Sequence, residues 1–133
     1  MRVFADSFYF LALLNINDPA HPRAVRFAGE PKLELITTRW ALAEVADALC
    51  APGLRERVVR FIDNLVAQPD VSISGKSDEL FKRGFDLYRE RSDKHWSLTD
   101  CISFVVMERE GVREALTGDR HFEQAGFVAL LAQ

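Results

Sequence analysis

The sequence predicts an α/β protein in which a central parallel sheet of about five strands is covered by helices on both faces. Two observations lead to this fold class. Short apolar or alternating segments follow one another along the chain with longer amphipathic segments between them, and Pro or Gly marks several of the breaks. The 133 residues, of which 48% are apolar and 28% charged, have the size and balance of one globular domain.

Five segments have the character of strands. The segment 33–37 ends in the β-branched residues Ile36 and Thr37, and the segment 71–74 alternates apolar residues with serines. Each is short, as expected for strands buried between two layers of helices. In chain order, the predicted strands are 2–5, 33–37, 71–74, 114–117 and 127–130.

Seven segments carry apolar residues at helical spacing. In the segment 54–67, for example, Val58, Phe61 and Leu65 fall on one face. The Pro-Gly pair at 52–53 stops the helix before it, and Gly111 ends a later one. In chain order, the predicted helices are 7–15, 19–28, 39–51, 54–67, 76–91, 97–110 and 120–124. No repeat or linker divides the chain, so we expect residues 1–133 to form a single domain.

Charge and composition exclude several classes of protein. The chain has 17 Lys and Arg against 20 Asp and Glu, a net charge of −3, which argues against broad coating of nucleic acid but allows a local basic rim. No segment approaches the 18 apolar residues of a membrane span. Asp6 interrupts the apolar start and no cleavage site of a signal peptide follows, so we expect a cytoplasmic protein. Cys50 and Cys101 lie in apolar segments and are interpreted as reduced core thiols.

Four carboxylates stand in surroundings unlike those of the other acids. Asp6 and Asp100 each lie between apolar residues, Glu44 lies on a helix that is apolar on nearly every side, and Asp119 comes just after a predicted strand. An ionised carboxylate in apolar surroundings is costly unless it is paired, hydrogen-bonded or bound to a metal.

Each of the four acids also has a purely structural interpretation. Asp6 and Asp119 follow strands and can cap the next helix. The run 97–100 fits a capping box. Glu44 can point outward beside Asp47 on the next turn.

The predicted topology nevertheless brings the four acids to one edge of the sheet. Asp6 and Asp119 follow the carboxyl ends of strands, where such folds bind ligands, and Glu44 and Asp100 lie in early turns of helices. No basic residue adjoins Glu44 or Asp100 in sequence, and four unpaired carboxylates would repel one another. Oxygen ligands suit Mg²⁺ or Mn²⁺, and hydrolysis of a phosphodiester is the natural reaction of such a site.

Hydroxyl residues stand close to these acids. Ser7, Thr99 and Thr117 can orient a carboxylate or a bound water, or they can simply cap helices. Asp93, seven residues before Asp100, is a candidate auxiliary acid, with loop polarity as the alternative explanation.

The chain resembles the PIN-domain family in four blocks that together run from Met1 to about Leu130. They are Asp6-Ser7 with the apolar run 11–14 and Asp18-Pro19-Ala20-His21, the run 37–45 around Glu44, the run 93–101 around Asp100, and the run 117–127 around Asp119. Four blocks in this order are specific for the family. The chain departs from it at Phe8, where many relatives carry a second hydroxyl, and this affects no metal ligand.

The resemblance implies a PIN-like three-layer α/β/α sandwich in which Asp6, Glu44, Asp100 and Asp119 bind Mg²⁺ or Mn²⁺ and form the catalytic site. It also implies endoribonuclease activity of the kind found in VapC-type toxins of toxin–antitoxin pairs. Such toxins are usually homodimers that a partner antitoxin silences through the acidic site.

An RNA substrate requires cations near the acids. Arg39, Lys94 and Arg120 are candidates for phosphate contacts because each lies in or beside one of the four blocks. His95 and Trp96 can stack on an unpaired base, although Trp96 is better interpreted as a packing residue. His121 and Phe122 are interpreted as structural.

Other functions fit the sequence less well. A receiver-type phosphoacceptor domain needs an Asp after its middle strand and a late Lys, but the strand 71–74 has no such Asp and no Lys follows Lys94. A haloacid-dehalogenase-type phosphatase needs an acid at the position of Phe8. A housekeeping RNA-processing nuclease and a non-catalytic PIN-fold scaffold are alternatives, and the presence of all four acids counts against the scaffold.

Overall fold

Five parallel strands form the central sheet of the computed structural model, which describes residues 1–133. The strands are β1 (Arg2–Ala5), β2 (Glu34–Thr38), β3 (Val71–Ser74), β4 (Glu114–Leu116) and β5 (Val128–Ala129). Their spatial order is β3-β2-β1-β4-β5, and every neighbouring pair is parallel.

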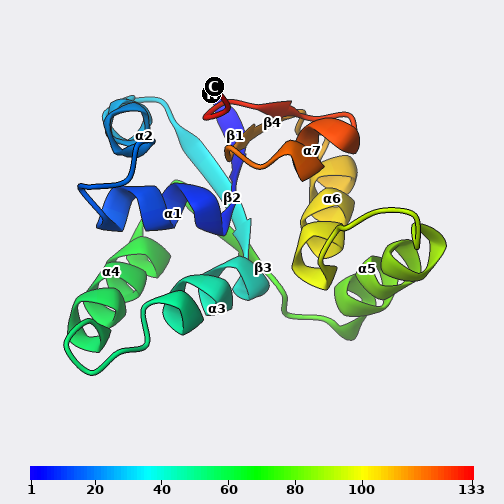
Figure 1. Cartoon of the computed structure of the whole chain (residues 1–133), viewed down its shortest axis with the longest axis horizontal. Helices are drawn as coiled ribbons and strands as arrows, with labels where there is room; N and C mark the ends of the chain where they lie inside the picture. Colours follow the sequence, from blue (N-terminus) through cyan, green and yellow to red (C-terminus); the bar gives the residue numbers. More distant parts are fainter.

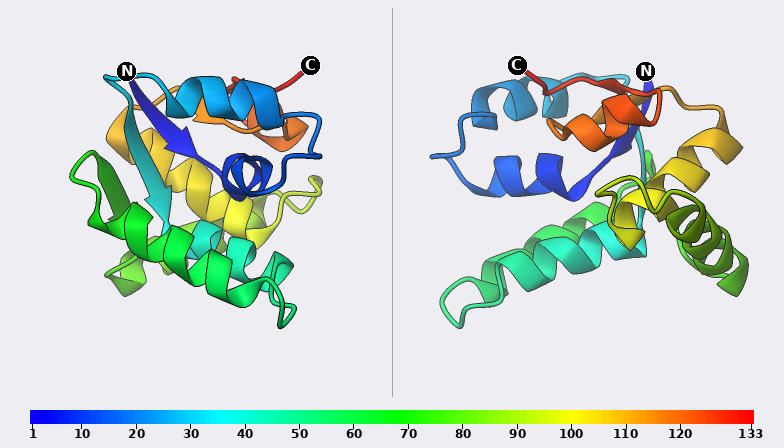
Figure 2. Two further views of the ribbon diagram at one scale, coloured as in Figure 1. Left: turned by 90° about the vertical axis from the view of Figure 1, so that its left-hand side faces the viewer. Right: turned by 45° about the vertical axis from the view of Figure 1, so that its right-hand side comes forward.

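Seven helices connect the strands and cover the sheet. They are α1 (Ser7–Leu14), α2 (His21–Ala28), α3 (Arg39–Ala48), α4 (Arg55–Ala67), α5 (Asp78–Glu90), α6 (Leu98–Glu110) and α7 (Arg120–Gln124). Helices α1 to α4 lie on one side of the sheet and α5 to α7 on the other (Figures 1 and 2). No helix is long and apolar enough to span a membrane.

The two faces of the sheet carry two separate apolar cores. Because successive side chains of a strand point to opposite faces, Val3 and Ala5 pack with α1 to α4, whereas Phe4 between them packs with α5 to α7. All three residues are fully buried, which places β1 at the centre of the molecule. The predicted α/β/α sandwich with about five parallel strands is confirmed.

The sheet has a topological switch point between β1 and β4. The chain leaves β1 into α1 on one face and leaves β4 into α7 on the other face (Figure 1). In such sheets a crevice opens at the carboxyl ends of the two strands where the order reverses, and ligands bind there. Asp6 follows β1 directly, and the loop 117–119 follows β4.

Predicted and observed elements differ mainly at their ends. Helix α3 ends at Ala48, three residues before the predicted end, so Cys50 lies exposed beyond the helix and is not a core thiol. Cys101 is free and buried, as expected. Strand β5 has only two residues, fewer than predicted, and forms one edge of the sheet, where it pairs with β4 alone.

Candidate active site

Asp6 is the most deeply buried of the four acids. It follows β1 and occupies the N-cap position of α1, but its carboxylate makes no capping bond. Instead Oδ2 accepts a hydrogen bond of 2.8 Å from the hydroxyl of Thr117, a residue 111 positions away that follows β4. The capping interpretation of the Asp6 carboxylate is therefore wrong, and the side chain faces the switch point.

Glu44 reaches the same edge from the middle of α3. Thr38 places this helix at the end of β2, because its hydroxyl accepts the N–H of Ala41 at 3.0 Å and caps the helix. The half-buried Glu44 carboxylate then accepts a hydrogen bond of 2.9 Å from the hydroxyl of Ser7. Of the two roles that the sequence left open for Ser7, its hydroxyl makes the contact with an acid.

Asp100 combines a structural role with a place in the cluster. The predicted capping box is present: the Asp100 N–H donates to Ser97 Oγ at 3.0 Å, and the Ser97 N–H donates to Asp100 Oδ2 at 3.1 Å. The same Oδ2 lies 2.9 Å from Nδ1 of His121. The carboxylate is buried, with 8% of the residue exposed.

Asp119 lies in the loop between β4 and α7, on the same side of the sheet as α6. As predicted for a cap, its Oδ1 accepts the N–H of His121 at 2.9 Å and starts α7. Its own N–H donates to Thr117 Oγ1 at 3.1 Å. The fully buried Thr117 hydroxyl therefore bonds to both Asp6 and Asp119, which is more than the predicted orientation of a single acid.

Burial and mutual repulsion raise the proton affinity of Asp6. Burial is the largest cause of a rise in its pKa from an ordinary 3.8 to about 7, and the negative charges of Asp100 and Glu44 raise it further. The hydrogen bond from Thr117 opposes the rise but does not cancel it.

Glu44 shows the same pattern more weakly. Burial raises its pKa, the hydrogen bond from Ser7 lowers it, and the charges of Asp100, Asp119 and Asp47 raise it again. Four acids that perturb one another in this way share one small region, as the sequence predicts.

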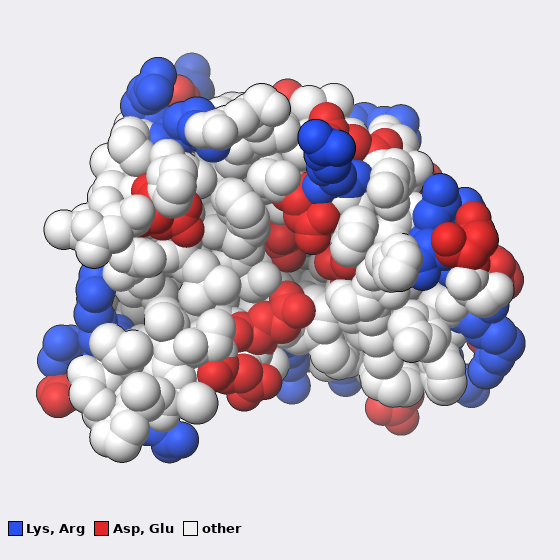
Figure 3. Space-filling model, in the orientation of Figure 1, with Lys and Arg blue, Asp and Glu red and all other residues white.

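No lysine or arginine pairs with any of the four acids. Figure 3 shows acidic side chains in the middle of one face, along the boundary between the α1–α4 half and the α5–α7 half, while Lys and Arg lie mostly around the periphery. A buried carboxylate without a cationic partner fits a site that a divalent cation completes. The donor atoms present are carboxylate oxygens and one imidazole nitrogen, so the residues fit a divalent metal ion.

His121 is the residue of this site that the sequence analysis missed. Its ring lies in the cluster, and its Nδ1 is 2.9 Å from Asp100 Oδ2 and 3.5 Å from Asp119 Oδ1. The potential ligand atoms of these three residues all lie within 4.8 Å of one another. The only indication in the sequence was the position of His121, two residues after Asp119. Because His121 was interpreted as structural, this position was not taken as a sign of a role in the site.

Thr99 and Asp93, two further candidates from the sequence, make contacts that do not involve the four acids. The hydroxyl of Thr99 makes no hydrogen bond, and only its carbonyl is used, as the acceptor for Ser103. Asp93 is exposed and forms a bidentate pair with Arg91 at 3.0 and 3.1 Å. This guanidinium lowers the pKa of Asp93, and the structure does not bring that carboxyl into the cluster.

The three basic residues that are candidates for contact with phosphate form no ion pairs. Arg39 starts α3 and rests its methylene groups against Gly75, Lys94 is half-buried before α6, and Arg120 is exposed at the start of α7. Arg39 therefore lies on the helix that carries Glu44, and Arg120 directly follows Asp119.

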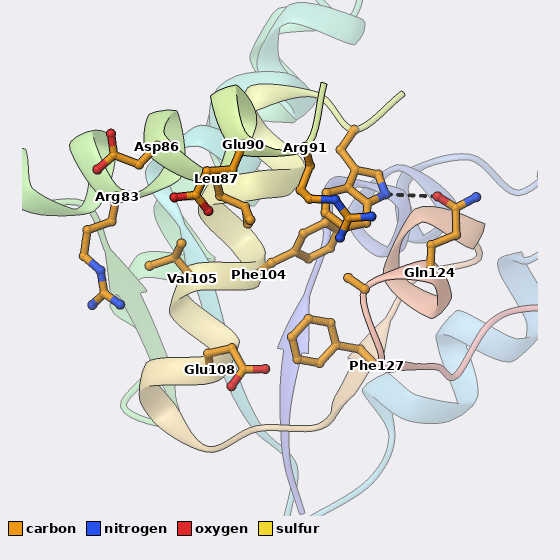
Figure 4. Close-up of a pocket in the computed structure, with 12 residues that line it drawn as sticks. Arg83, Asp86, Leu87, Glu90, Arg91, Phe104, Val105, Glu108, Gln124 and Phe127 are labelled. Carbon is orange, nitrogen blue, oxygen red and sulfur yellow. Dashed lines mark hydrogen bonds between the residues drawn. The ribbon is translucent and has the colours of Figure 1, made fainter. Parts of the chain in front are cut away.

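Trp96 is a packing residue, as interpreted from the sequence. It lines a cavity of about 500 Å³ between α5, α6 and α7, which none of the four acids lines (Figure 4). Its indole N–H donates to Gln124 at 3.0 Å, its ring meets Phe104 edge to face at 5.1 Å, and Arg91 covers it at 5.0 Å.

Phe8 explains the glycine of the fourth sequence block. A Cβ added at Gly118 would lie 2.5 Å from Cζ of Phe8, whose half-buried ring covers the loop after β4. Phe8 therefore packs closely against the loop that carries Thr117 and Asp119.

The sheet order and the two helical layers form a PIN-like α/β/α fold. No protein-family model matches the chain. In sequence the chain is similar to the 23S rRNA-specific endonuclease VapC20 of Mycobacterium tuberculosis, with 24% identity over 136 residues and 95% of both chains covered.

Comparison of structures gives the same relationship. The crystal structure of VapC20 from Mycobacterium tuberculosis, described as a Sarcin-Ricin loop cleaving toxin, matches with a TM-score of 0.83 over 95% of this chain and 96% of that chain. VapBC-1 from nontypeable Haemophilus influenzae matches with a TM-score of 0.63 at 12% identity. The match covers 94% of this chain and 92% of that chain. The predicted PIN-like fold and the resemblance to VapC-type proteins are confirmed.

Proposed function

We propose that this chain is a divalent-metal-dependent endoribonuclease and the toxin of a toxin–antitoxin pair. The observation that supports this most directly is the cluster of four carboxylates without a Lys or Arg partner at the switch point of the sheet. The similarity to VapC20, a 23S rRNA-specific endonuclease, supports RNA as the substrate.

In this proposal Asp6 and Asp100 anchor the principal ion, and Glu44 and Asp119 complete its surroundings. A bound Mg²⁺ or Mn²⁺ supplies activation of a water and neutralisation of charge at the phosphate. The protein's own part is to hold the carboxylates in place: Thr117 fixes Asp6, and Ser7 fixes Glu44. The burial of Asp6 strengthens the charge interactions of its own carboxylate.

Cations around the acids would hold the RNA backbone. Arg39, Lys94 and Arg120 have no carboxylate partner, so their charges are available to phosphates. A protein with a net charge of −3 needs such local cations to bring a polyanion to an acidic site.

The proposed partners are an antitoxin and a second copy of the chain. The match to VapBC-1 supports the antitoxin, and we place the protein in the cytoplasm, where RNA is available.

An aromatic stripe supports the homodimer. It consists of four residues whose ring centroids lie 6.1–6.4 Å apart from one to the next: Trp40, Phe81, Phe85 and Tyr88. The last three are 41–47% exposed on α5, and aromatic residues that gather on a surface are typical of interfaces.

Cleavage of RNA by the purified protein tests the proposal. Wild type and Asp100→Asn are incubated with ribosomal RNA and tRNA in Mg²⁺, Mn²⁺ or EDTA, and the ends of the products are mapped. We expect cuts that require metal, leave 5′-phosphates and disappear in Asp100→Asn, since asparagine keeps the shape and loses the charge.

Asp86→Asn is the matched control. Asp86 is exposed on α5 and pairs with Arg89 at 3.0 Å, so the same loss of charge should leave cleavage unchanged. Equal cleavage by wild type and by folded Asp100→Asn would contradict the assignment of the site. A folded wild type that binds Mn²⁺ but cuts none of these RNAs would contradict the proposed substrate.

A further inference from the structure

An imidazole stands among the four acids, where carboxylate oxygens alone would be sufficient for Mg²⁺. His121 Nδ1 lies 2.9 Å from Asp100 Oδ2 and 3.5 Å from Asp119 Oδ1. These acids come from different elements, α6 and the loop after β4, so the ring bridges two separate parts of the site.

The fold fixes this ring in position. The N–H of His121 is bound by Asp119 Oδ1 at the start of α7. The next residue, Phe122, is fully buried. Its ring centroid lies 6.2 Å from that of Phe4 and 5.0 Å from that of Phe104. Helix α7 therefore cannot turn without disrupting the core, and His121 stays beside the two carboxylates.

The spacing of the three donor atoms fits a shared ion, which would replace the hydrogen bond between His121 Nδ1 and Asp100 Oδ2. Neighbouring ligand atoms of an octahedral ion lie about 3.0 Å apart when each is about 2.1 Å from the metal. The separations of 2.9 and 3.5 Å bracket this value, and all three donors lie within 4.8 Å of one another.

We propose that His121 is a nitrogen ligand of the divalent ion and biases the site toward a transition-metal ion such as Mn²⁺ over Mg²⁺. This inference rests on the proposed function, because it concerns the ion of the same site. Mg²⁺ binds oxygen ligands and keeps several waters, whereas imidazole nitrogen is a ligand of transition-metal ions. Exchange of one oxygen for a nitrogen therefore changes the relative affinity for the two ions.

The other two histidines serve as internal comparisons. His21 Nδ1 lies 2.7 Å from the carbonyl of Ala12, so its ring contributes to local structure. His95 is exposed in the loop before Trp96 and bonds to nothing. His95→Ala is thus a matched control that removes an imidazole close in sequence to Asp100 but outside the cluster.

Pulsed electron paramagnetic resonance on Mn²⁺ tests the proposal without any assay of activity. The metal-free protein, with its histidines labelled with ¹⁵N, receives one equivalent of Mn²⁺, and modulation of the electron spin echo reports coordinated imidazole. We expect coupling to one imidazole in wild type and in His95→Ala, and none in His121→Ala or His121→Gln.

Titrations of both ions give a second readout. In His121→Ala we expect affinity for Mn²⁺ to fall by about tenfold or more, with a much smaller loss for Mg²⁺. Mn²⁺ that binds wild type without imidazole coupling, or with coupling that persists in His121→Ala, would overturn the proposal. Mn²⁺ binding that Asp100→Asn leaves unchanged would overturn the metal site itself, and the two failures are therefore distinguishable.

Discussion

A single hydroxyl, that of Thr117, joins two of the four acids. It donates to Asp6 and accepts from the N–H of Asp119, and it is fully buried. A buried polar group that loses its partner costs far more than an exposed one. The geometry of the acidic edge therefore depends on a residue that carries no charge.

Replacing Thr117 with Val should destabilise the protein by about 1–3 kcal/mol, because a buried carboxylate and a backbone N–H lose their partner. Affinity for Mn²⁺ should fall as well, since Asp6 is no longer held. Denaturant unfolding and Mn²⁺ titration measure the two effects. Thr117→Ser keeps the hydroxyl and should be close to wild type in metal affinity; an equal loss in both variants would contradict the role of the hydrogen bonds.

The pKa of Asp6 predicts how the stability of the metal-free protein changes with pH. In the folded state the pKa is about 7, against an ordinary 3.8. Between these values the folded protein holds a proton that the unfolded chain has lost, so stability decreases as the pH rises from about 4 to about 7. The loss from this group is at most about 4 kcal/mol, at 1.36 kcal/mol for each unit of pKa shift.

Urea unfolding in EDTA at pH 5 and pH 8 checks this prediction. Wild type should be more stable at pH 5, and Asp6→Asn should show a smaller difference between the two pH values because its amide does not ionise. Saturating Mn²⁺ should also reduce the difference by neutralising the carboxylates. A wild type that gains stability toward pH 8 to the same extent as Asp6→Asn would contradict the raised pKa.

At this scale the sequence revealed the acids but not their histidine neighbour. Asp6, Glu44 and Asp100 could be recognised because a carboxylate among apolar residues stands out in the local sequence. His121 meets Asp100 from 21 residues away, and that contact depends on how α7 packs against α6, which local sequence does not encode.

Among the elements, the loop between β4 and α7 has the tightest packing requirement at the site. Gly118 lies under the ring of Phe8, so any side chain there must displace either the ring or the loop. The loop carries Thr117 and Asp119, and a shift of the loop moves both.

Gly118→Ala should therefore destabilise the protein by about 1–3 kcal/mol through overpacking, and it should weaken binding of Mn²⁺. In the double variant Phe8→Ala with Gly118→Ala, the loss of stability should be smaller than the sum of the two single losses, because the clash is gone. Unfolding free energies of the four proteins in this cycle provide the measurement. Strict additivity would show that the two residues do not interact.

The sequence predicted which elements exist better than where they end. Helix α6 begins as predicted because its capping box is local, formed by Ser97 and Asp100. Helix α3 ends at Ala48, before the predicted stop at the Pro-Gly pair 52–53, and Leu49 after it has left the helical conformation while it still packs against the α1–α4 core. Helix ends without a cap are decided by tertiary packing.

For the whole molecule, the aromatic stripe on α5 is the feature that a monomer explains least. Phe81, Phe85 and Tyr88 are spaced so that they fall on one face of the helix, and the structure leaves that face exposed beside Trp40. The order of strands was predictable only as a class, because the alternation of strands and helices does not specify which strands are neighbours.

Phe85→Glu should convert the proposed homodimer into a monomer, because a charge in the middle of an apolar interface is not compensated. Sedimentation velocity of wild type and variant measures the change. Val59→Glu is the matched control, since Val59 is 57% exposed on α4, outside the stripe, and its replacement should leave the mass unchanged. A wild type that sediments as a monomer at all concentrations would contradict the dimer.

The pairing of β1 with β4 has a consequence for the order in which the molecule assembles. Asp6 and Glu44 come from the first half of the chain and Asp100 and Asp119 from the second, and the bond from Thr117 to Asp6 spans 111 residues. Contacts between such distant segments require closure of a long loop, and this slows folding. In the proposed role, a chain that is still folding therefore has no complete centre and leaves the surrounding RNA intact.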